Sequence, residues 1–481
     1  MLLLAASLMV AIAYFKDVPK NPVGFFVDEA SIAYNAHTIS QHGTDEYGYV
    51  FPLYFRAFGE YKSPVYIYAL SVLFWFTGPS IFASRLLSAV AGLTAAMLLG
   101  LLGARLTNRR IIGFLVFISA ALTPWIFEIS RLVFEVSLFP ALLALFLLLL
   151  HSASKNEKWS WSIAALLGLL LGVMFYTYSV GRLLAPFFAL GLVFFFTRKR
   201  WRGIVLTWAV FGLTLLPFAV FTLRHPGALS ERFKHVTFVK PEHTRAQIVG
   251  RFVQNYAKNF SPRSWLVSGD PEPRHHLPGM GSLLIGVVIL ALLGIVVALV
   301  RHRSEAWWQF VLYGFAVSPI PASLTLDHFH TLRLVAIPVF LIVLTVPAIE
   351  CLLSENGEWR KARRATLTVL VLAILLQGAV FQWRFRVSLP RVDAFDSYYQ
   401  ELLATALRRS ERPIYLLDKT PAAYVYAFWY ATLHNVNVNN FRRASVNEPI
   451  PHGALVISHE LPCTNCEIIV ERGQFRVYVQ K

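Results

Sequence analysis

Long apolar stretches separated by short polar loops dominate the sequence. Runs of roughly 17–25 apolar residues are long enough to cross a bilayer as helices, and about eleven runs in this chain approach or reach that length. They cover Met1–Phe15, Ile81–Leu106, Ile111–Phe127, Phe134–Leu150, Trp159–Tyr176, Leu183–Thr197, Gly203–Leu223, Gly281–Val300, Trp307–Ala322, Leu332–Cys351 and Ala365–Phe381. The pattern predicts a polytopic α-helical membrane protein.

Two segments depart from this pattern. Val65–Thr77 is apolar but short, which favours an interfacial helix lying along the membrane over a full span. The end of the chain alternates short strand-like and helix-like stretches, which predicts a small α/β domain over residues 384–481. Its expected strands are RPIYLLD, ALVISH and a hairpin of EIIVER with QFRVYVQ joined at Gly473, and its helix begins at Thr420–Pro421.

Composition agrees with a membrane protein and bears on its partners. The chain is 56% hydrophobic and 15% charged, whereas soluble domains carry about 25% charged residues. The net charge of +17 has two readings, nucleic-acid binding and the loop bias of a membrane protein. The basic residues cluster between apolar spans, which favours the second reading and excludes nucleic acid as an expected partner.

The distribution of basic residues predicts the orientation. With the N-terminus inside, the expected cytoplasmic loops contain LTNRR, KNEK, TRKRWR, RHR and WRKARR, while the opposite short loops carry mainly Arg131 and Arg182. This matches the positive-inside rule. Counting Val65–Thr77 as a span would reverse every later loop. We therefore expect the first loop, residues 16–64, and the C-terminal domain to lie outside.

The expected outer loops concentrate ionisable residues. Of 27 acidic residues in the chain, five lie in Gly24–Pro64: Asp28, Glu29, Asp45, Glu46 and Glu60. Other outer loops carry Glu128, Arg131 and Glu135, at a spacing typical of one helical face, then Arg182, and then Asp327, His328, His330 and Arg333. Such groups near membrane depth are costly and often functional, although single ones also serve as interfacial anchors. Four such loops on one side favour a site.

Carboxylates beside guanidinium groups suit transfer from a lipid phosphate. An acceptor hydroxyl is a poor nucleophile, so a positioned carboxylate must take its proton. The departing phosphate needs Arg, Lys or a metal to stabilise its charge. The planar fork of Arg matches phosphate oxygens.

Several motifs occur in an order that resembles bacterial GT-C glycosyltransferases, including protein O-mannosyltransferase relatives and lipid A aminoarabinose transferases. They are VDEASIAYNAHTIS, GTDEYG, EYKSPVYIYAL, SIFASRLLSAVAG, ISRLVFE, YSVGRLLAP, PRSWLVSGDPEPRHHLPGMGSL and HTLRLVAIP, which together span roughly Val23–Pro338. The resemblance implies a GT-C transmembrane domain over residues 1–383. It also implies inverting transfer of a sugar from a polyprenyl phosphate on the extracytoplasmic side.

The resemblance assigns roles to individual residues. It makes Asp28 the catalytic base, with Glu29 either a second catalytic acid or a helix-start acid. The candidate ligands of the donor phosphate are Lys62, Arg131, Arg182 and Arg333. It further implies a divalent metal ion, for which Glu60 and His330 are the candidate ligands, although Glu-Tyr-Lys-Ser-Pro is longer than the Glu-Lys-Pro of the aminoarabinose transferases. A single interfacial His is alternatively a hydrogen-bonded structural residue.

Two further groups of residues leave alternatives open. His275 and His276 follow Asp270 in SGDPEPRHH, which suggests either a metal site or a rigid loop cap. The prolines of this stretch favour the loop. Cys463 and Cys466 form a small disulfide if the tail is extracytoplasmic, or otherwise remain free thiols.

The sequence thus predicts a glycosyltransferase in a bacterial cytoplasmic membrane. Its expected partners are a polyprenyl-phosphate sugar donor, a lipid, glycan or protein acceptor, and membrane lipids. The alternative is a transporter or flippase for a lipid-linked glycan, which would show repeated halves, and the sequence contains no internal repeat. A third reading, an envelope assembly protein acting through its tail, leaves the acids of the first loop unexplained.

Overall fold

The chain forms two compact units in a computed structural model that describes residues 2–355, 358–387, 391–419, 423–463 and 465–481. The helical unit comprises Met1–Lys16 and Ser88–Ser388. The loop–sheet unit comprises Asp17–Leu87 and Leu389–Lys481. Helix α4 (Ile81–Thr107) continues from the second unit into the first.

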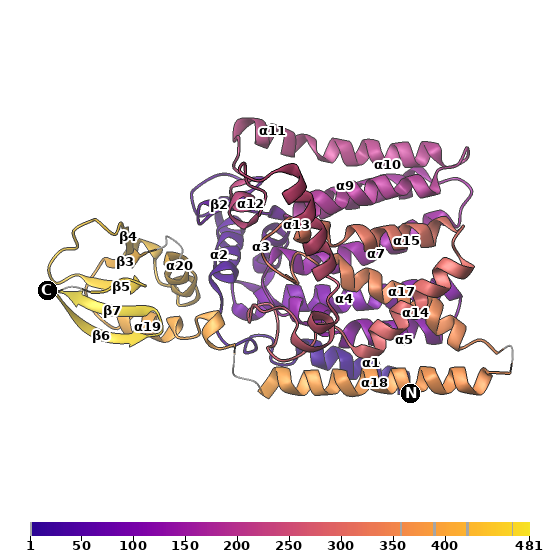
Figure 1. Cartoon of the computed structure of the whole chain (residues 1–481). Coiled ribbons are helices and arrows are strands. Elements are labelled where there is room, and N and C mark those ends of the chain that lie inside the picture. The colour runs from indigo at the N-terminus through magenta and orange to yellow at the C-terminus, as the bar shows by residue number, and fades with distance from the viewer. Residues whose placement is uncertain (1, 356–357, 388–390, 420–422, 464) are drawn as a thin grey trace. The chain divides into compact units, whose positions relative to one another are not determined.

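Helices, most of them apolar, build the helical unit. Besides most of α4, they are α1 (Leu2–Phe15), α5 (Arg110–Leu122), α6 (Pro124–Ile129), α7 (Phe139–Ser154), α8 (Trp161–Thr177), α9 (Gly181–Gly191), α10 (Trp201–Thr214), α11 (Leu216–Arg224), α12 (Glu231–Val236), α13 (Arg245–Lys258), α14 (Ile285–Arg301), α15 (Ala306–Val317), α16 (Ile320–Ser323), α17 (Ala336–Leu352) and α18 (Arg360–Val387). Short 3-10 or π turns are η1 (Glu135–Leu138), η2 (Leu192–Phe195) and η3 (Ser264–Ser268). Figure 1 shows α5, α9, α10, α14, α15, α17 and α18 running alongside one another.

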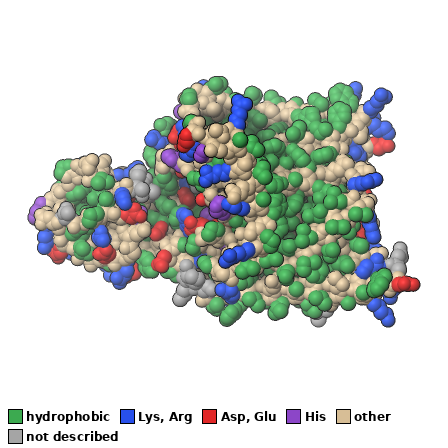
Figure 2. Space-filling model, viewed as in Figure 1, with side chains coloured by type: hydrophobic (Ala, Val, Ile, Leu, Met, Phe, Trp, Pro, Cys, Tyr) green, Lys and Arg blue, Asp and Glu red, His purple; other side chains and the backbone are tan. Residues whose placement is uncertain are grey.

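Length and apolarity allow several of these helices to cross a membrane. In the described part of the chain four helical stretches are long and apolar enough, namely Ile81–Thr107, Glu135–Ser154, Trp201–Arg224 and Arg360–Val387. Shorter apolar helices accompany them, among them α14 and α17. Side chains such as Leu223, Val300 and Leu376 are strongly exposed, and Figure 2 shows hydrophobic side chains spread over the flank of the bundle. Such a surface suits contact with lipid.

Helix α17 lies at the centre of the helical unit. All of its residues from Ala336 to Ile349 are buried. It packs closely against α14 because Gly294 has no side chain: a Cβ there would lie 1.7 Å from the carbonyl oxygen of Leu344. Small residues at helix crossings allow such backbone approach in membrane bundles.

Two predicted features of the bundle differ from the structure. Glu128, Arg131 and Glu135 do not share a helical face, because α6 ends at Ile129 and the chain turns before η1 begins at Glu135. The predicted span Ile111–Phe127 is likewise divided at Thr123, where Pro124 starts α6. Proline at the first position of a helix needs no backbone donor, so it favours a new start there.

The loop–sheet unit joins the first loop to the tail. Its elements from the first loop are α2 (Val27–His42), β1 (Phe55–Ala57), β2 (Glu60–Lys62) and α3 (Pro64–Thr77), while the tail supplies η4 (Asp393–Phe395), α19 (Tyr399–Leu407), β3 (Ile414–Asp418), α20 (Tyr424–Leu433), η5 (Val438–Asn440), β4 (Phe441–Ala444), β5 (Leu455–His459), β6 (Cys466–Arg472) and β7 (Phe475–Gln480). The tail strands form a sheet of order β4-β3-β5-β7-β6, in which β3 pairs in parallel with β4 and β5 and the others pair antiparallel. Strand β4 was not predicted. The expected helix start at Thr420–Pro421 lies outside the described residues.

The tail packs directly on the first loop. The N–H of Phe25 donates to the carbonyl oxygen of Phe395 over 2.9 Å, and the Phe25 ring stacks on Trp429 at 5.6 Å. Gly24 has a φ of +88°, and a Cβ there would lie 2.3 Å from the same carbonyl oxygen, so only glycine fits. The structure therefore groups residues 17–87 with 389–481, whereas the sequence suggested a boundary at residue 384.

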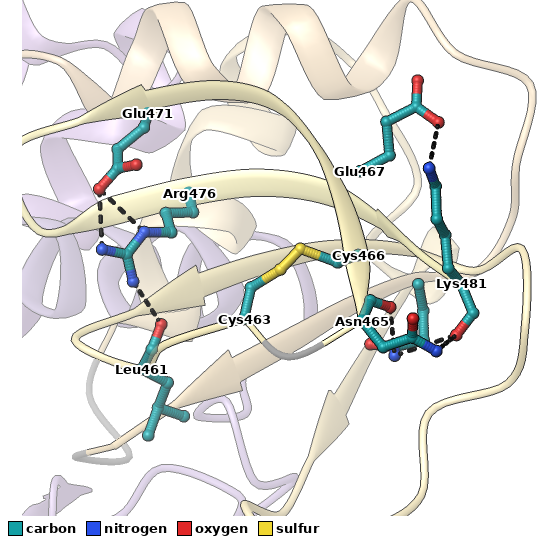
Figure 3. Close-up of a disulfide and its surroundings, with 9 residues drawn as sticks. Leu461, Cys463, Asn465, Cys466, Glu467, Glu471, Arg476 and Lys481 are labelled. Atoms are coloured by element: carbon teal, nitrogen blue, oxygen red, sulfur yellow. Dashed lines mark hydrogen bonds and ion pairs between the residues drawn. A yellow bond between two sulfur atoms is a disulfide. The ribbon is translucent and has the colours of Figure 1, made fainter.

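A disulfide joins Cys463 and Cys466 at the start of β6 (Figure 3). This is one of the two alternatives left open by the sequence. Around it, Arg476 pairs with Glu471 and also donates to the carbonyl oxygen of Leu461. The disulfide thus secures the loop that leads into the terminal hairpin.

Candidate functional site

The first turn of α2 carries two adjacent acids in different surroundings. Asp28 keeps 28% of its side chain exposed, whereas Glu29 is fully buried. The Glu29 carboxylate accepts a hydrogen bond from the backbone N–H of Phe26 at 2.9 Å, which caps the helix. Acids favour this position because the helix N-terminus is partially positive.

Arg85 forms a buried ion pair with the carboxylate of Glu29. Its Nη2 and Nε donate to the two carboxylate oxygens at 2.9 and 3.1 Å, and its other bonds reach the carbonyl oxygens of Pro22 and Gly24. The guanidinium also lies 5.3 Å from the centre of the Phe25 ring. Both side chains are buried, which agrees with the alternative of a helix-start acid for Glu29, while its role as a second catalytic acid stays a prediction. Arg85 was not predicted from the sequence, where its signal is a lone Arg in the apolar start of α4.

Lys62 brings its ammonium group to Asp28. Its Nζ lies 2.7 Å from Asp28 Oδ1, and its side chain is only 8% exposed. A tight hairpin of β1 and β2 presents Lys62, with Phe58 and Gly59 at positive φ in the turn, as a two-residue type I′ turn requires. Two sequence-predicted site residues are thus in contact, and the partly exposed carboxylate is held at a fixed place.

Glu60 lies on β2, two residues before Lys62, and is partly buried. It belongs to the loop–sheet unit, while His330, its predicted companion at a metal, belongs to the helical unit. A shared metal between these two residues therefore stays a prediction.

A cavity of about 440 Å³ in the helical unit is lined by two of the predicted phosphate ligands, Arg182 and Arg333. Arg182 follows the start of α9, and its Nη1 lies 3.4 Å from the carbonyl oxygen of Leu229. Arg333 Nη1 contacts Thr325 Oγ1 at 2.9 Å and Asp327 Oδ2 at 2.5 Å. The remaining lining is mostly apolar, with Phe218, Leu183, Phe233, Val236 and Leu324 among its members. This combination suits a phosphate attached to a hydrocarbon chain.

Arg131, also predicted to bind the donor phosphate, is not among the residues that line this cavity, so that role stays a prediction. Its side chain is buried, and its Nη1 and Nη2 donate to the carbonyl oxygens of Tyr14 and Lys16 at 2.8 and 3.1 Å. Its guanidinium also lies 5.7 Å from the centre of the Phe127 ring. Arg131 thus satisfies carbonyls at the C-terminal end of α1, where cations are favourable.

Asp270, His275 and His330 form a cluster with metal-ligand chemistry. One ligand atom of each lies within 4.8 Å of the others, and His275 Nδ1 is 3.4 Å from Asp270 Oδ2. Thr331 orients the same carboxylate oxygen through its N–H at 2.7 Å and its hydroxyl at 2.8 Å. Burial acts to raise the pKa of Asp270, but the hydrogen bond and charge of His275, with the charge of His330, hold it below its usual range. The prolines of this stretch favoured a loop cap, and His330 lies 60 residues further along the chain, so the sequence did not connect it with Asp270.

The neighbouring His276 has a different partner. Its Nδ1 lies 2.5 Å from Glu128 Oε2, and the N–H of Leu277 donates to Glu128 Oε1 at 2.6 Å. Burial acts to lower the pKa of His276, but the adjacent Glu128 carboxylate raises it. This buried pair pins the loop that carries the cluster, so Glu128 is structural.

A third acid of the first loop meets the tail. Glu46 Oε2 accepts a hydrogen bond of 3.0 Å from the hydroxyl of Tyr424, and the guanidinium of Arg443 lies 3.6 Å from the centre of the Tyr424 ring. Burial raises the pKa of Glu46 to about 7, against the effect of the Tyr424 hydrogen bond. Glu46 therefore helps to attach the tail.

Residues 61–223 match the family model described as dolichyl-phosphate-mannose-protein mannosyltransferase. No curated protein matches the sequence of this chain. The family match covers α3 through α11 and includes Lys62, Arg131 and Arg182.

Solved structures of low sequence identity share the fold. The apo structure of ArnT from Cupriavidus metallidurans has a TM-score of 0.60 and 12% identity, covering 99% of this chain and 97% of that one. The same enzyme bound to undecaprenyl phosphate has a TM-score of 0.59 at 12% identity, with the same coverage of both chains.

The oligosaccharyltransferase AglB from Archaeoglobus fulgidus, in complex with an inhibitory peptide and a dolichol-phosphate, has a TM-score of 0.53 and 12% identity. The match covers 92% of this chain and 64% of AglB. The predicted GT-C fold and the predicted resemblance to this group of proteins are therefore confirmed. The prediction of a multi-pass membrane protein is also confirmed.

Proposed function

We propose that this protein is a membrane glycosyltransferase that moves a sugar from a polyprenyl-phosphate donor to a hydroxyl group of a lipid, glycan or protein acceptor. The observation that carries the proposal is the largely apolar cavity lined by Arg182 and Arg333. Undecaprenyl phosphate and dolichol-phosphate, which are bound in the similar structures, combine the same two chemistries.

In the proposed reaction the acceptor oxygen attacks the anomeric carbon of the sugar while the bond to the phosphate oxygen breaks. Asp28 takes the hydroxyl proton, and attack from the face opposite the phosphate inverts the anomeric carbon. The ion pair with Lys62 keeps the Asp28 carboxylate oriented for this role. The polyprenyl phosphate leaves with a new negative charge, which Arg182 and Arg333 stabilise, and for which Lys62 stays a predicted ligand.

The cluster of Asp270, His275 and His330 fits a divalent metal ion. Two imidazoles and one carboxylate are a common donor set for zinc. The 3.4 Å between His275 Nδ1 and Asp270 Oδ2 matches two ligands on bonds of about 2.0–2.1 Å in tetrahedral geometry. A cation bound there would supply positive charge for a phosphate. Thr331 orients the carboxylate of Asp270 through its N–H and its hydroxyl.

The test of the proposal is transfer by the purified protein from a labelled polyprenyl-phosphate sugar. Arg182→Ala and Arg333→Ala are expected to raise the KM for the donor by about tenfold to a hundredfold, as loss of a charged hydrogen bond would. Arg198→Ala, on an exposed loop, is the matched control. Unchanged donor dependence in both variants would reject the phosphate role. Lipid movement without any sugar transfer would favour a flippase.

The acceptor is found by mass spectrometry of glycolipids and glycoproteins from a deletion strain. The side of the reaction is tested with single cysteines introduced near Tyr47 and near Lys199. A membrane-impermeant reagent applied outside is expected to label the first and not the second. The opposite result would overturn the proposed extracytoplasmic orientation, which the Cys463–Cys466 disulfide supports because disulfides persist in oxidising compartments.

A further inference from the structure

The helical unit has a second cavity, of about 410 Å³, far from Arg182 and Arg333. Lys155, which lines it, precedes α8, whereas Tyr178, which lines the first cavity, directly follows α8. The 17 residues of α8 span about 25 Å at 1.5 Å per residue. The two cavities therefore lie at opposite ends of the helical unit, and the second lies among the basic loops.

Two buried polar atoms on side chains that line this second cavity lack a partner. Within the described residues, neither His151 Nδ1 nor Trp307 Nε1 makes a hydrogen bond. The two side chains are only 4% and 6% exposed, and their rings are in edge contact at 4.9 Å. Buried polar atoms are nearly always satisfied in native proteins. An indole N–H can only donate, so Trp307 calls for an acceptor in the cavity.

Charge around the cavity favours an anionic acceptor. Lys155 is exposed at its mouth, and Arg200 is held beside it by the carbonyl oxygens of Ser154 and Asn156. Of the two acids on the lining, Glu305 is paired with His302 at 2.6 Å and Glu350 is exposed at the rim. The loops around this end add Arg109, Arg110, Arg198, Lys199, Arg202, Arg301 and Arg303.

The walls of the cavity are apolar. Leu106, Phe195, Trp308 and Val346 contribute to them, beside helices whose outer faces expose hydrocarbon. A polar floor, a cationic mouth and apolar walls at the end of spanning helices are the features by which membrane proteins bind phospholipid headgroups on the side of their basic loops.

We propose that this cavity binds the phosphodiester headgroup of an anionic phospholipid, with Trp307 Nε1 donating to a phosphate oxygen and Lys155 balancing its charge. The lipid enters from the leaflet at the basic end. His151 Nδ1 completes the polar floor, and the first carbons of the lipid pack on the apolar walls. This site is separate from the proposed donor site and does not depend on the proposed function.

The experiment is native mass spectrometry of the full-length protein after incubation with phosphatidylglycerol or phosphatidylcholine of identical acyl chains. One tightly retained phosphatidylglycerol is expected. Trp307→Phe, which removes the indole N–H and keeps an aromatic ring, and Lys155→Ala should each weaken its retention by about fivefold or more. The matched controls are Trp161→Phe, at an exposed residue outside the cavity, and Lys158→Ala.

Each outcome decides the proposal. Equal retention by Trp307→Phe and Trp161→Phe, in protein with an unchanged melting temperature, would overturn the site. Equal retention of phosphatidylcholine would overturn the preference for an anionic headgroup. Inorganic phosphate is the second arm: if it displaces the lipid at similar concentration, the ligand is a free anion and the lipid assignment fails.

Discussion

Two ion pairs lie side by side at the first turn of α2. Their acids are neighbours in sequence, but the pairs differ in exposure and in the further contacts of their basic residues. Glu29 and Arg85 are fully buried, and Arg85 uses its remaining donors on the carbonyl oxygens of Pro22 and Gly24. Asp28 and Lys62 are closer together, yet the Asp28 side chain stays 28% exposed. A charged side chain committed to the backbone holds the loop together. One that pairs while remaining partly exposed is available for chemistry.

Asp28→Asn tests most directly whether the partly exposed ion pair acts in catalysis. We expect sugar transfer to fall by about a hundredfold to ten-thousandfold, the usual contribution of a general base. The melting temperature should fall less than in a variant of the fully buried Glu29–Arg85 pair, because Asp28 is partly exposed. Turnover with the labelled donor and thermal unfolding are measured on the same sample. Wild-type turnover in Asp28→Asn would contradict the role of Asp28 as the base.

Arg85→Met should mainly lower stability, whereas Asp28→Asn should mainly lower sugar transfer. Removing one member of a buried pair leaves an unpaired charge on Glu29, which costs about 3–5 kcal/mol of stability. The loss is measured by thermal unfolding. The double variant Arg85→Met/Glu29→Gln should recover part of it. Full stability of the single variant would show that Arg85 does not hold the loop.

Lys62→Met tests the exposed pair from its basic side. We expect transfer to fall by about tenfold to a hundredfold, with a raised KM for the donor, because a charged hydrogen-bond donor is lost. Lys62→Arg keeps the charge and should lose less. A variant of Lys62 with an unchanged KM for the donor would count against the phosphate role.

The smallest expected effect concerns pH and a third acid of the same loop. Burial raises the pKa of Glu46 to about 7 and that of Asp418 also to about 7. The folded state therefore favours the protonated acids. Their contribution to stability is complete below the usual carboxyl range and is lost as pH rises through about 7. Unfolding at pH 5.5 and 8 should show this loss in wild type, and Glu46→Gln should reduce it. If the stability of Glu46→Gln depends on pH as strongly as that of wild type, Glu46 is not a source of the pH dependence.

The sequence predicted the parts of the molecule that depend on local pattern. Apolar runs coincide with the helices of the bundle, and β3, β5, β6 and β7 occupy the expected strand segments. Strand β4 was not expected, because FRRA lacks an alternating apolar face and gains its place only by pairing with β3. Pairing between distant segments leaves no local signal.

The roles of charged residues were harder to predict for the same reason. Arg131 and Arg182 look alike in sequence, each beside an apolar run. Only the fold turns Arg131 towards the carbonyl oxygens at the end of α1 and places Arg182 on a cavity wall. The cluster of Asp270, His275 and His330 likewise needs two distant loops to meet. Long-range packing, not residue type, separates these cases.

The hydrogen bond from Phe25 to Phe395 has a consequence for the biosynthesis of the chain. Residues 17–87 complete their compact unit only with residues 389–481. The first loop therefore leaves the ribosome long before its folding partner is made and must wait, with Phe25 and the buried charges of Glu29 and Arg85 unshielded by the tail. Domains usually fold in order of synthesis. In this protein a segment made much later completes the fold around Asp28.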